Sequence, residues 1–255
     1  MSPRHRITAA IRNAAAQGEP ALVAYLTAGF PRRESFREHL RALARAADVV
    51  EVGVPFTDPM ADGVTIQRAS LAALAQGVSL RWILAELEEL RDLTTPLLLM
   101  SYLNPLLAFG VTSLAAAAAR AGVAGFIVPD LPLDESSELR AALDARQIAL
   151  VQMVTPVTEP RRLRQVCAGS QGFVYAVTST GTTGRNVAVP ADVLAYLDRV
   201  RASSPLPVCA GFGIRSREQV ARLSGHVDGV VVGSALVEVL ERGEDAGAFL
   251  RAVRG

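Results

Sequence analysis

The chain has 255 residues, of which half are hydrophobic and a fifth are charged. This composition supplies ample apolar material for a core and argues against a disordered chain. The 26 basic and 25 acidic residues nearly cancel, so there is no basic surplus to neutralise a nucleic-acid backbone. We therefore expect a single compact domain over residues 1–255 that does not bind nucleic acid.

All basic residues are arginine, and lysine is absent. A chain without lysine cannot form a Schiff base, so any carbon–carbon bond cleavage must proceed without an imine. Cys167, Cys209, His5, His39 and His226 lie far apart and lack the spacing of metal ligands. We expect neither a metal site nor a disulfide framework.

The N-terminal segment carries several arginines but no following apolar block, so it does not have the pattern of a secretory signal. The longest uncharged stretch, residues 94–119, is interrupted by Pro96, Pro105 and Gly110, which makes it a poor membrane span. The sequence therefore predicts a cytoplasmic protein without a membrane segment.

In chain order, residues 4–17 form the first predicted helix, and eight short apolar runs follow it. The runs alternate with Ala-, Leu- and Arg-rich stretches of helical composition, a pattern typical of repeated βα units in a parallel sheet. Because eight such units close a barrel, we predict an α/β fold, a single (β/α)8 barrel whose floor is capped by the N-terminal helix. The predicted strands are residues 21–26, 49–54, 97–100, 125–128, 148–154, 173–177, 207–210 and 229–232.

The connection after the second predicted strand is unusually long. It carries two helical stretches, residues 65–76 and 80–93, where one helix would complete a βα unit. An insertion at this point lies at the carboxyl-terminal rim of the barrel, where barrel enzymes build their active sites. We therefore interpret it as a functional segment.

Glu51 is a carboxylate inside the otherwise apolar second run. Buried glutamate is rare unless paired, so one interpretation gives it an arginine partner or a solvent-facing position. In the other interpretation it points into the top of the barrel, where desolvation raises its pKa and makes it a general acid or base. The loop that follows contributes Asp58, which we expect to cap a turn, and Asp62.

The seventh and eighth runs end in small residues, Gly211 and Gly213 in one case and Gly233 and Ser234 in the other. Small residues allow backbone N–H groups to approach a ligand, and such pairs form a phosphate site in many barrels. Glycine also marks ordinary tight turns. The polar loop of residues 178–185 follows the sixth run, and we expect it either to close over a substrate or to be a plain surface loop.

The segment EVGVPFTDPMADG, residues 51–63, resembles the signature of the tryptophan synthase alpha subunit. The similarity continues over nearly the whole chain. Further matching segments are Thr27 to Gly29, Tyr102, Asn104 and Pro105, Val128 to Pro132, Thr183 and Gly184, Gly211 to Ile214, and Val232 to Ala235.

The resemblance implies a lyase that cleaves indole-3-glycerol phosphate to indole and glyceraldehyde 3-phosphate, a retro-aldol reaction without a cofactor. It also implies a partner, because the family passes indole to a pyridoxal-phosphate beta subunit in an alpha2-beta2 complex that makes L-tryptophan. Glu51 matches the acid/base that protonates the indole ring carbon, and Asp62 matches the carboxylate that faces the ring nitrogen. The implied indole contacts are Tyr102, Ile127, Tyr175 and Phe212, and the implied phosphate contacts are Gly184, Gly213, Gly233 and Ser234. Ile127 also fits a plain core position.

The chain departs from the family at Val64, where proline is usual, and in the loop after the sixth run, where Thr180, Thr182 and Arg185 stand. In the family that the chain resembles, the loop at Val64 meets the partner subunit, so we expect both departures to fall on segments that contact the partner or close the site. A free-standing lyase that releases indole for a secondary pathway is therefore one alternative, and a catalytically silent barrel that regulates a synthase is another. A sugar-phosphate isomerase would share the phosphate site without needing two carboxylates. An unpaired buried carboxylate is costly to keep, which argues against the silent barrel.

Overall fold

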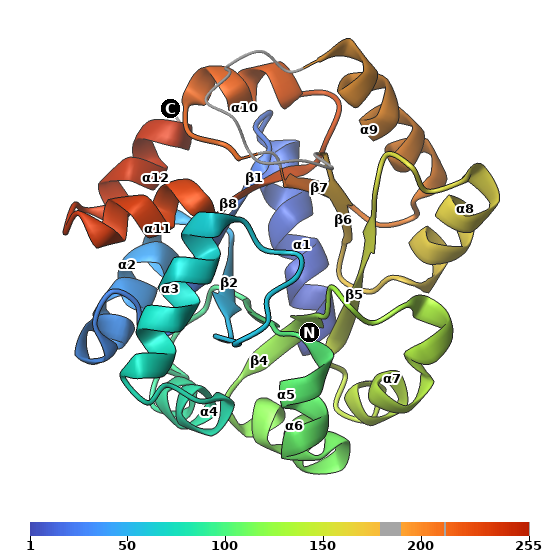
Figure 1. Ribbon diagram of the computed structural model, residues 1–255. Helices are drawn as coiled ribbons and strands as arrows, with labels where there is room; N and C mark the ends of the chain where they lie inside the picture. Colours follow the sequence, from blue (N-terminus) through green and yellow to red (C-terminus); the bar gives the residue numbers. More distant parts are fainter. Residues whose placement is uncertain (179–189, 212, 255) are drawn as a thin grey trace.

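The computed structural model describes residues 1–178, 190–211 and 213–254, and its strands close into a barrel (Figure 1). Every neighbouring pair is parallel, including β8 with β1, which confirms the predicted (β/α)8 barrel. The strands are β1 (Ala21–Thr27), β2 (Val49–Gly53), β3 (Leu97–Met100), β4 (Val123–Ile127), β5 (Ala149–Val154), β6 (Val174–Val177), β7 (Val208–Gly211) and β8 (Gly229–Val232).

Helices surround the barrel (Figure 1), and their buried apolar side chains pack against it. In α2, for example, Phe36, Leu40 and Leu43 recur at helical spacing and are buried. None of the helices within the described ranges is long and apolar enough to cross a membrane. The helices are α1 (Pro3–Ala16), α2 (Phe36–Ala46), α3 (Val64–Ala75), α4 (Leu80–Glu88), α5 (Leu103–Phe109), α6 (Val111–Arg120), α7 (Ser137–Asp144), α8 (Pro160–Gly169), α9 (Ala191–Ser203), α10 (Arg217–Leu223), α11 (Ser234–Glu241) and α12 (Ala246–Arg254).

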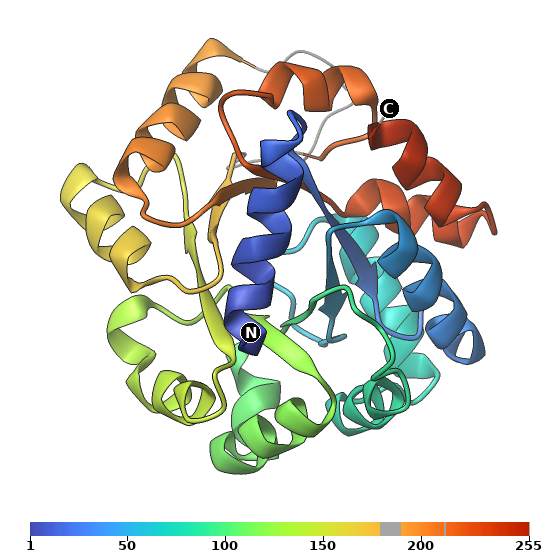
Figure 2. The same cartoon turned by 180° about the vertical axis from the view of Figure 1, so that it is seen from behind.

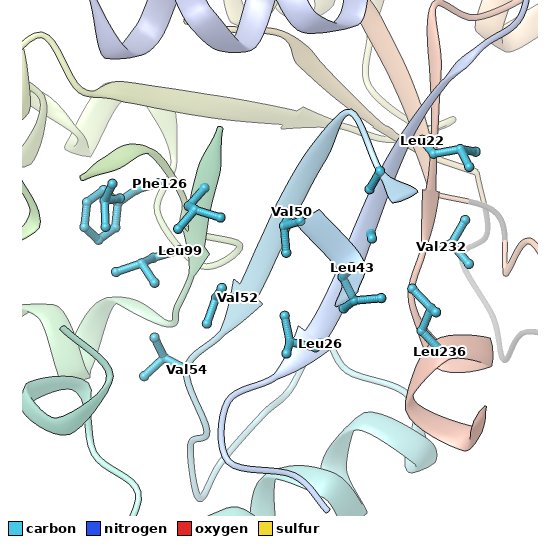
Figure 3. Packing of buried hydrophobic residues seen from close by; sticks show 14 of the residues in the cluster. Leu22, Leu26, Leu43, Val50, Val52, Val54, Leu99, Phe126, Val232 and Leu236 are labelled. Atoms are coloured by element: carbon cyan, nitrogen blue, oxygen red, sulfur yellow. The ribbon is translucent and has the colours of Figure 1, made fainter. Parts of the chain in front are cut away.

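The strand side chains divide the core into an outer and an inner part. Val50 and Val52 of β2 belong to the outer part, where they lie in one cluster with Leu43 of α2 (Figure 3). Val49 and Leu98 belong to the inner part, inside the barrel. Successive side chains of a strand point to opposite faces, so one buried strand supplies both parts. Each fully buried Val or Leu side chain stabilises the fold by roughly 1.5–3 kcal/mol.

The N-terminal helix α1 closes one end of the barrel, as predicted. It crosses the barrel on the side opposite the β2–α3 loop (Figure 2). Ile7 and Ile11 of α1 are fully buried in the inner core, in the same cluster as Val23 and Phe173. Because this end is filled with apolar side chains, a ligand must approach from the carboxyl ends of the strands.

The long connection after β2 contains two helices, as expected, with small differences in length. Helix α3 begins one residue early at Val64, and α4 ends at Glu88 instead of continuing to Leu93. Leu90 and Leu93 still pack against the core through turns, so the apolar pattern continued past the end of the helix. A further helix, α5, is separated from α6 by Gly110, whose φ of +88° favours glycine.

Candidate active site

Glu51 is the central residue of β2 and points into the barrel. Its neighbours Val50 and Val52 face the helices, and side chains alternate along a strand. The Glu51 side chain is 1% exposed, and its Oε2 atom has no hydrogen-bond partner in the part of the chain that the structure describes. The alternatives of an arginine pair or a solvent-facing position are therefore wrong within the described residues.

The surroundings of Glu51 favour its protonated form. Burial and, to a smaller extent, the negative charge of Asp62 together raise the pKa of the Glu51 carboxyl to about 8. Desolvation acts in this way because a charged carboxylate loses its hydration inside an apolar barrel. Glu51 consequently keeps its proton at neutral pH and can deliver it.

Asp62 lies in the loop between β2 and α3 and is half-buried. Desolvation raises the pKa of this carboxyl to about 6, and the nearby Tyr102 hydroxyl acts in the opposite direction. Hydrogen bonds that involve the side chains of Tyr102 and Gln67 help to hold the loop in place. The N–H of Ala61 donates to the Tyr102 hydroxyl at 2.9 Å, and Gln67 Nε2 donates to the Asp62 backbone oxygen at 2.8 Å. The ring of Phe56 stacks on Tyr102 with 5.4 Å between centroids.

The two carboxyls therefore differ in protonation over a defined range. Between about pH 6 and pH 8, Glu51 carries a proton while Asp62 is ionised. The two groups interact, so these values describe the titration of the pair. An acid beside a fixed anion is an arrangement that divides acid–base work between two carboxyl groups.

Tyr175 and Ile127 lie inside the barrel. Burial raises the pKa of the Tyr175 phenol well above its ordinary value, and among nearby charges Glu51 contributes most. A Cβ on Gly211 of the next strand would lie 2.7 Å from the Tyr175 hydroxyl, so only glycine fits beside this ring. Ile127 is fully buried in the inner core, which agrees with the core position that the sequence left open.

The expected phosphate contacts lie at the ends of β7 and β8, which pair through Gly211 and Val231. Gly213 has a φ of +64°, which favours glycine, and Gly233 is the N-cap of α11, in which Ser234 is the first residue. The first N–H groups of a helix have no partner within the helix and attract anions. Gly184 and Phe212, and all but the first residue of the loop 178–185, lie outside the described residues.

Sequence reasoning missed Tyr25 and Thr27, two residues of β1 whose hydroxyl groups are 3.2 Å apart inside the barrel. Tyr25 is the register partner of Glu51 on the neighbouring strand. A polar side chain in an otherwise apolar run was the signal that singled out Glu51, and the same signal applies to Tyr25. The β1–β2 register that joins the two residues could not be obtained from the sequence.

Two surface hollows of about 260 and 270 Å³ lie elsewhere and are lined by neither Glu51 nor Asp62. The first lies beside α10, and the second lies between the ends of β4 and β5 and helix α8. In the described ranges, no group of three or more His, Cys, Asp or Glu side chains could hold a metal ion. Among the described residues, the two carboxyls and the phenols around them are prominent chemical groups at the barrel mouth.

A (β/α)8 barrel with a buried acid and a neighbouring anion near the carboxyl ends of its strands has the arrangement of an acid–base enzyme of the barrel class. Comparisons with known proteins identify the family. A sequence profile described as tryptophan synthase alpha chain matches residues 11–252. The chain is 47% identical over 249 residues to the tryptophan synthase alpha chain of Nitratidesulfovibrio vulgaris, and 97% of each chain is covered.

Solved structures give the same result. A tryptophan synthase structure from Mycobacterium tuberculosis is similar with a TM-score of 0.91 and 36% identity, covering 98% of this chain and 96% of the other. The tryptophan synthase subunit alpha of Legionella pneumophila has a TM-score of 0.87 and 31% identity, covering 98% of this chain and 97% of the other.

The chain therefore belongs to the tryptophan synthase alpha chain family. Proteins of this family are lyases that cleave indole-3-glycerol phosphate in tryptophan biosynthesis, and they pair with a beta subunit. The match over nearly the full length confirms the resemblance seen in the sequence motifs. It also removes the sugar-phosphate isomerase from the alternatives.

Proposed function

We propose that Glu51 and Asp62 are the catalytic residues with which this chain cleaves indole-3-glycerol phosphate. Glu51 gives its proton to C3 of the indole ring, and Asp62 stabilises the positive charge that arises at the ring N–H. The Glu51 carboxylate then accepts the proton of the substrate hydroxyl next to the breaking bond. The carbon–carbon bond breaks, its electron pair restores the aromatic ring, and indole and glyceraldehyde 3-phosphate are released. Glu51 thus gives one proton and takes one back, so it ends the reaction in the protonated state in which it began.

The observation that carries this proposal is the buried Glu51 carboxyl, whose Oε2 atom has no hydrogen-bond partner among the described residues and which is protonated at neutral pH beside the Asp62 anion. Indole is a poor leaving group until C3 is protonated, and that step needs an acid of raised pKa. A barrel that only regulated a partner would gain nothing from this group, because burying a carboxyl without a partner costs stability. The active lyase is thus favoured over the silent barrel.

The direct test is to incubate the purified chain with indole-3-glycerol phosphate, alone and with a tryptophan synthase beta subunit, and to measure both products. We expect equal amounts of indole and glyceraldehyde 3-phosphate. A chain that is folded by circular dichroism but releases no indole under either condition would contradict the proposal. Fast release by the chain alone, with no acceleration by the partner, would favour the free-standing lyase.

We propose that the substrate phosphate binds at Gly213, Gly233 and Ser234; Gly184, which the sequence also assigns to this site, lies outside the described residues. Gly233→Asp should raise KM at least about tenfold, because a negative charge at the N-terminus of α11 repels the phosphate. Among the described residues, the nearest heavy atom to a Cβ at Gly233 is Tyr25 Cβ at 3.9 Å, so the added Cβ meets no close contact there. Gly233→Ala adds the Cβ without the charge and should raise KM by less. Equal KM values for Gly233→Asp and wild type would contradict the assignment.

We propose that the β2–α3 segment and α3 contact the beta subunit. Met60, Val64 and Leu71 are 87%, 71% and 57% exposed, and these three large apolar side chains lie on this short stretch. Val64 and Leu71 are seven residues apart, so they lie on one face of α3. Apolar side chains gathered on a surface mark interaction sites. The same loop carries Asp62, so docking there would act on the catalytic carboxyl.

Val64→Pro should strengthen the stimulation of indole release by a beta subunit. Val64 is the first residue of α3, where proline is favoured, and Gly63 has the extended φ and ψ of −73° and 162° that precede proline easily. A stiffer loop loses less conformational entropy on docking, so we expect roughly two- to fivefold tighter binding. Measuring the rate of indole release at increasing concentrations of the beta subunit gives this affinity. Val64→Ala, which removes apolar surface without stiffening, should weaken binding; the reverse order of the two variants would exclude this contact.

A further inference from the structure

Tyr25 lies beside the proposed acid, on the neighbouring strand. It is the register partner of Glu51, and its side chain is 7% exposed. Ala24 and Leu26 on either side belong to the outer core, so Tyr25 points into the barrel as Glu51 does. The two side chains therefore start from adjacent positions on the same inner face.

The Tyr25 hydroxyl lies toward the open end of the barrel. A Cβ built on Gly53 would overlap the ring and the hydroxyl of Tyr25, so the phenol covers the place where residue 53 has no side chain. Gly53 follows Glu51 by two residues and shares its face. The hydroxyl therefore lies at the position of residue 53, two residues beyond Glu51 on the same inner face, where Thr27 Oγ1 holds it at 3.2 Å.

The groups that face Glu51 come from several elements. The negative charge of Asp62, in the β2–α3 loop, raises the pKa of Glu51. The charge of Glu51 in turn raises the pKa values of Tyr25, Tyr175 of β6 and Cys209 of β7. Burial is the largest cause that raises the pKa of both phenols and of the thiol, so all three stay neutral. Tyr25 thus remains a neutral hydroxyl near two carboxyls.

We propose that Tyr25 is a positioning residue whose hydroxyl, held by Thr27, turns to the Glu51 carboxylate when that group has given up its proton. This inference rests on the proposed role of Glu51. In the resting state Glu51 Oε2 has no partner among the described residues, while the Tyr25 hydroxyl is bonded to Thr27. Once Glu51 is charged, a nearby hydrogen-bond donor stabilises the carboxylate, because hydrogen bonds to charged groups are stronger than those between neutral groups. The Thr27 hydroxyl can then donate a hydrogen bond to the phenol oxygen of Tyr25. The only proton transferred is that of Glu51.

Tyr175 is the other phenol that could play this part. It lies on β6, which pairs with β5 and β7 and does not adjoin β2. The Tyr175 hydroxyl lies close to Gly211 of β7. The Tyr25 hydroxyl lies close to Gly53, which is on the same strand as Glu51. The geometry therefore favours Tyr25, and the experiment includes both.

The test measures the pKa of Glu51 directly, by carbon-13 NMR of protein labelled at glutamate carboxyls, with Glu51→Gln to assign the signal. Tyr25→Phe should raise this pKa by about one pH unit, because the anion loses a donor worth roughly that amount. Thr27→Val should move it in the same direction by less. Tyr196→Phe is the matched control. Its buried hydroxyl donates to Val154 at 2.9 Å outside the site, so the pKa of Glu51 should not move.

Kinetics give a second readout. Tyr25→Phe should lower kcat about tenfold with less than a twofold change in KM, and the basic limb of the kcat/KM profile should move up in pH with Glu51. The inference is overturned if Tyr25→Phe leaves the pKa of Glu51 and kcat unchanged, or if Tyr175→Phe moves that pKa and Tyr25→Phe does not. If the wild type releases no indole, the proposed function fails, while the NMR titration still decides whether Tyr25 acts on Glu51.

Discussion

Glu51→Gln should lower indole release at least about 100-fold, the loss typical of a missing general acid or base. Glutamine keeps the size of the side chain but has no proton to deliver to C3. Single-turnover measurements with saturating indole-3-glycerol phosphate separate this loss from any change in binding. Glu19→Gln is the matched control, because Glu19 is exposed just before β1 at the closed end of the barrel. Glu51→Gln with more than about a tenth of the wild-type rate would contradict the role of Glu51.

The same variant should fold and should be more stable than the wild type in alkaline solution. The pKa of Glu51 is about 8 in the folded protein, above its ordinary value, so over that range the folded chain holds a proton that the unfolded chain has released. Stability therefore falls as pH rises from the ordinary pKa of a carboxyl through about 8. Glu51→Gln removes this loss. Chemical denaturation at pH 6 and at pH 9 checks it, and a wild type that does not weaken between them would show that Glu51 is not buried as a neutral acid.

Asp62→Asn should also lower the rate by roughly 100- to 1,000-fold, because a neutral amide cannot offset the positive charge that develops at the indole nitrogen. KM should change less than kcat, since this charge arises only in the transition state. Asp58→Asn is the matched control in the same loop. Asp58 is exposed, and its replacement should cost less than about twofold.

Asp62→Asn has a further consequence that a purely structural role would not produce. The Asp62 charge is one cause of the raised pKa of Glu51, so its removal should move the basic limb of the pH profile to lower pH. Tyr25→Phe is expected to move the same limb upward. Opposite shifts of the basic limb in Asp62→Asn and Tyr25→Phe would distinguish the effect of the Asp62 charge from the effect of the Tyr25 hydroxyl. An Asp62→Asn enzyme with near wild-type kcat would remove Asp62 from the mechanism.

The local sequence determined the strands. Short apolar runs with turn residues between them predict β-strands, and all eight appear within a few residues of their expected bounds. The first helix, the insertion and the carboxylate in β2 were visible for the same reason, because each depends on residues close together in the chain. Helix ends were less certain: α4 stops at Glu88 although the apolar pattern runs on to Leu93, which packs through a turn.

The tertiary structure decided the environment of the Glu51 carboxyl. The sequence left it either paired with arginine or buried as an acid, and only barrel closure decided between them, by turning alternate side chains of β2 inward. The raised pKa depends on the apolar interior, and the neighbouring Tyr25 depends on the β1–β2 register. Burial and register are set by contacts between residues far apart in the chain. No local pattern encodes them, so the sequence could single out the Glu51 carboxyl but could not place Tyr25 next to it on the neighbouring strand.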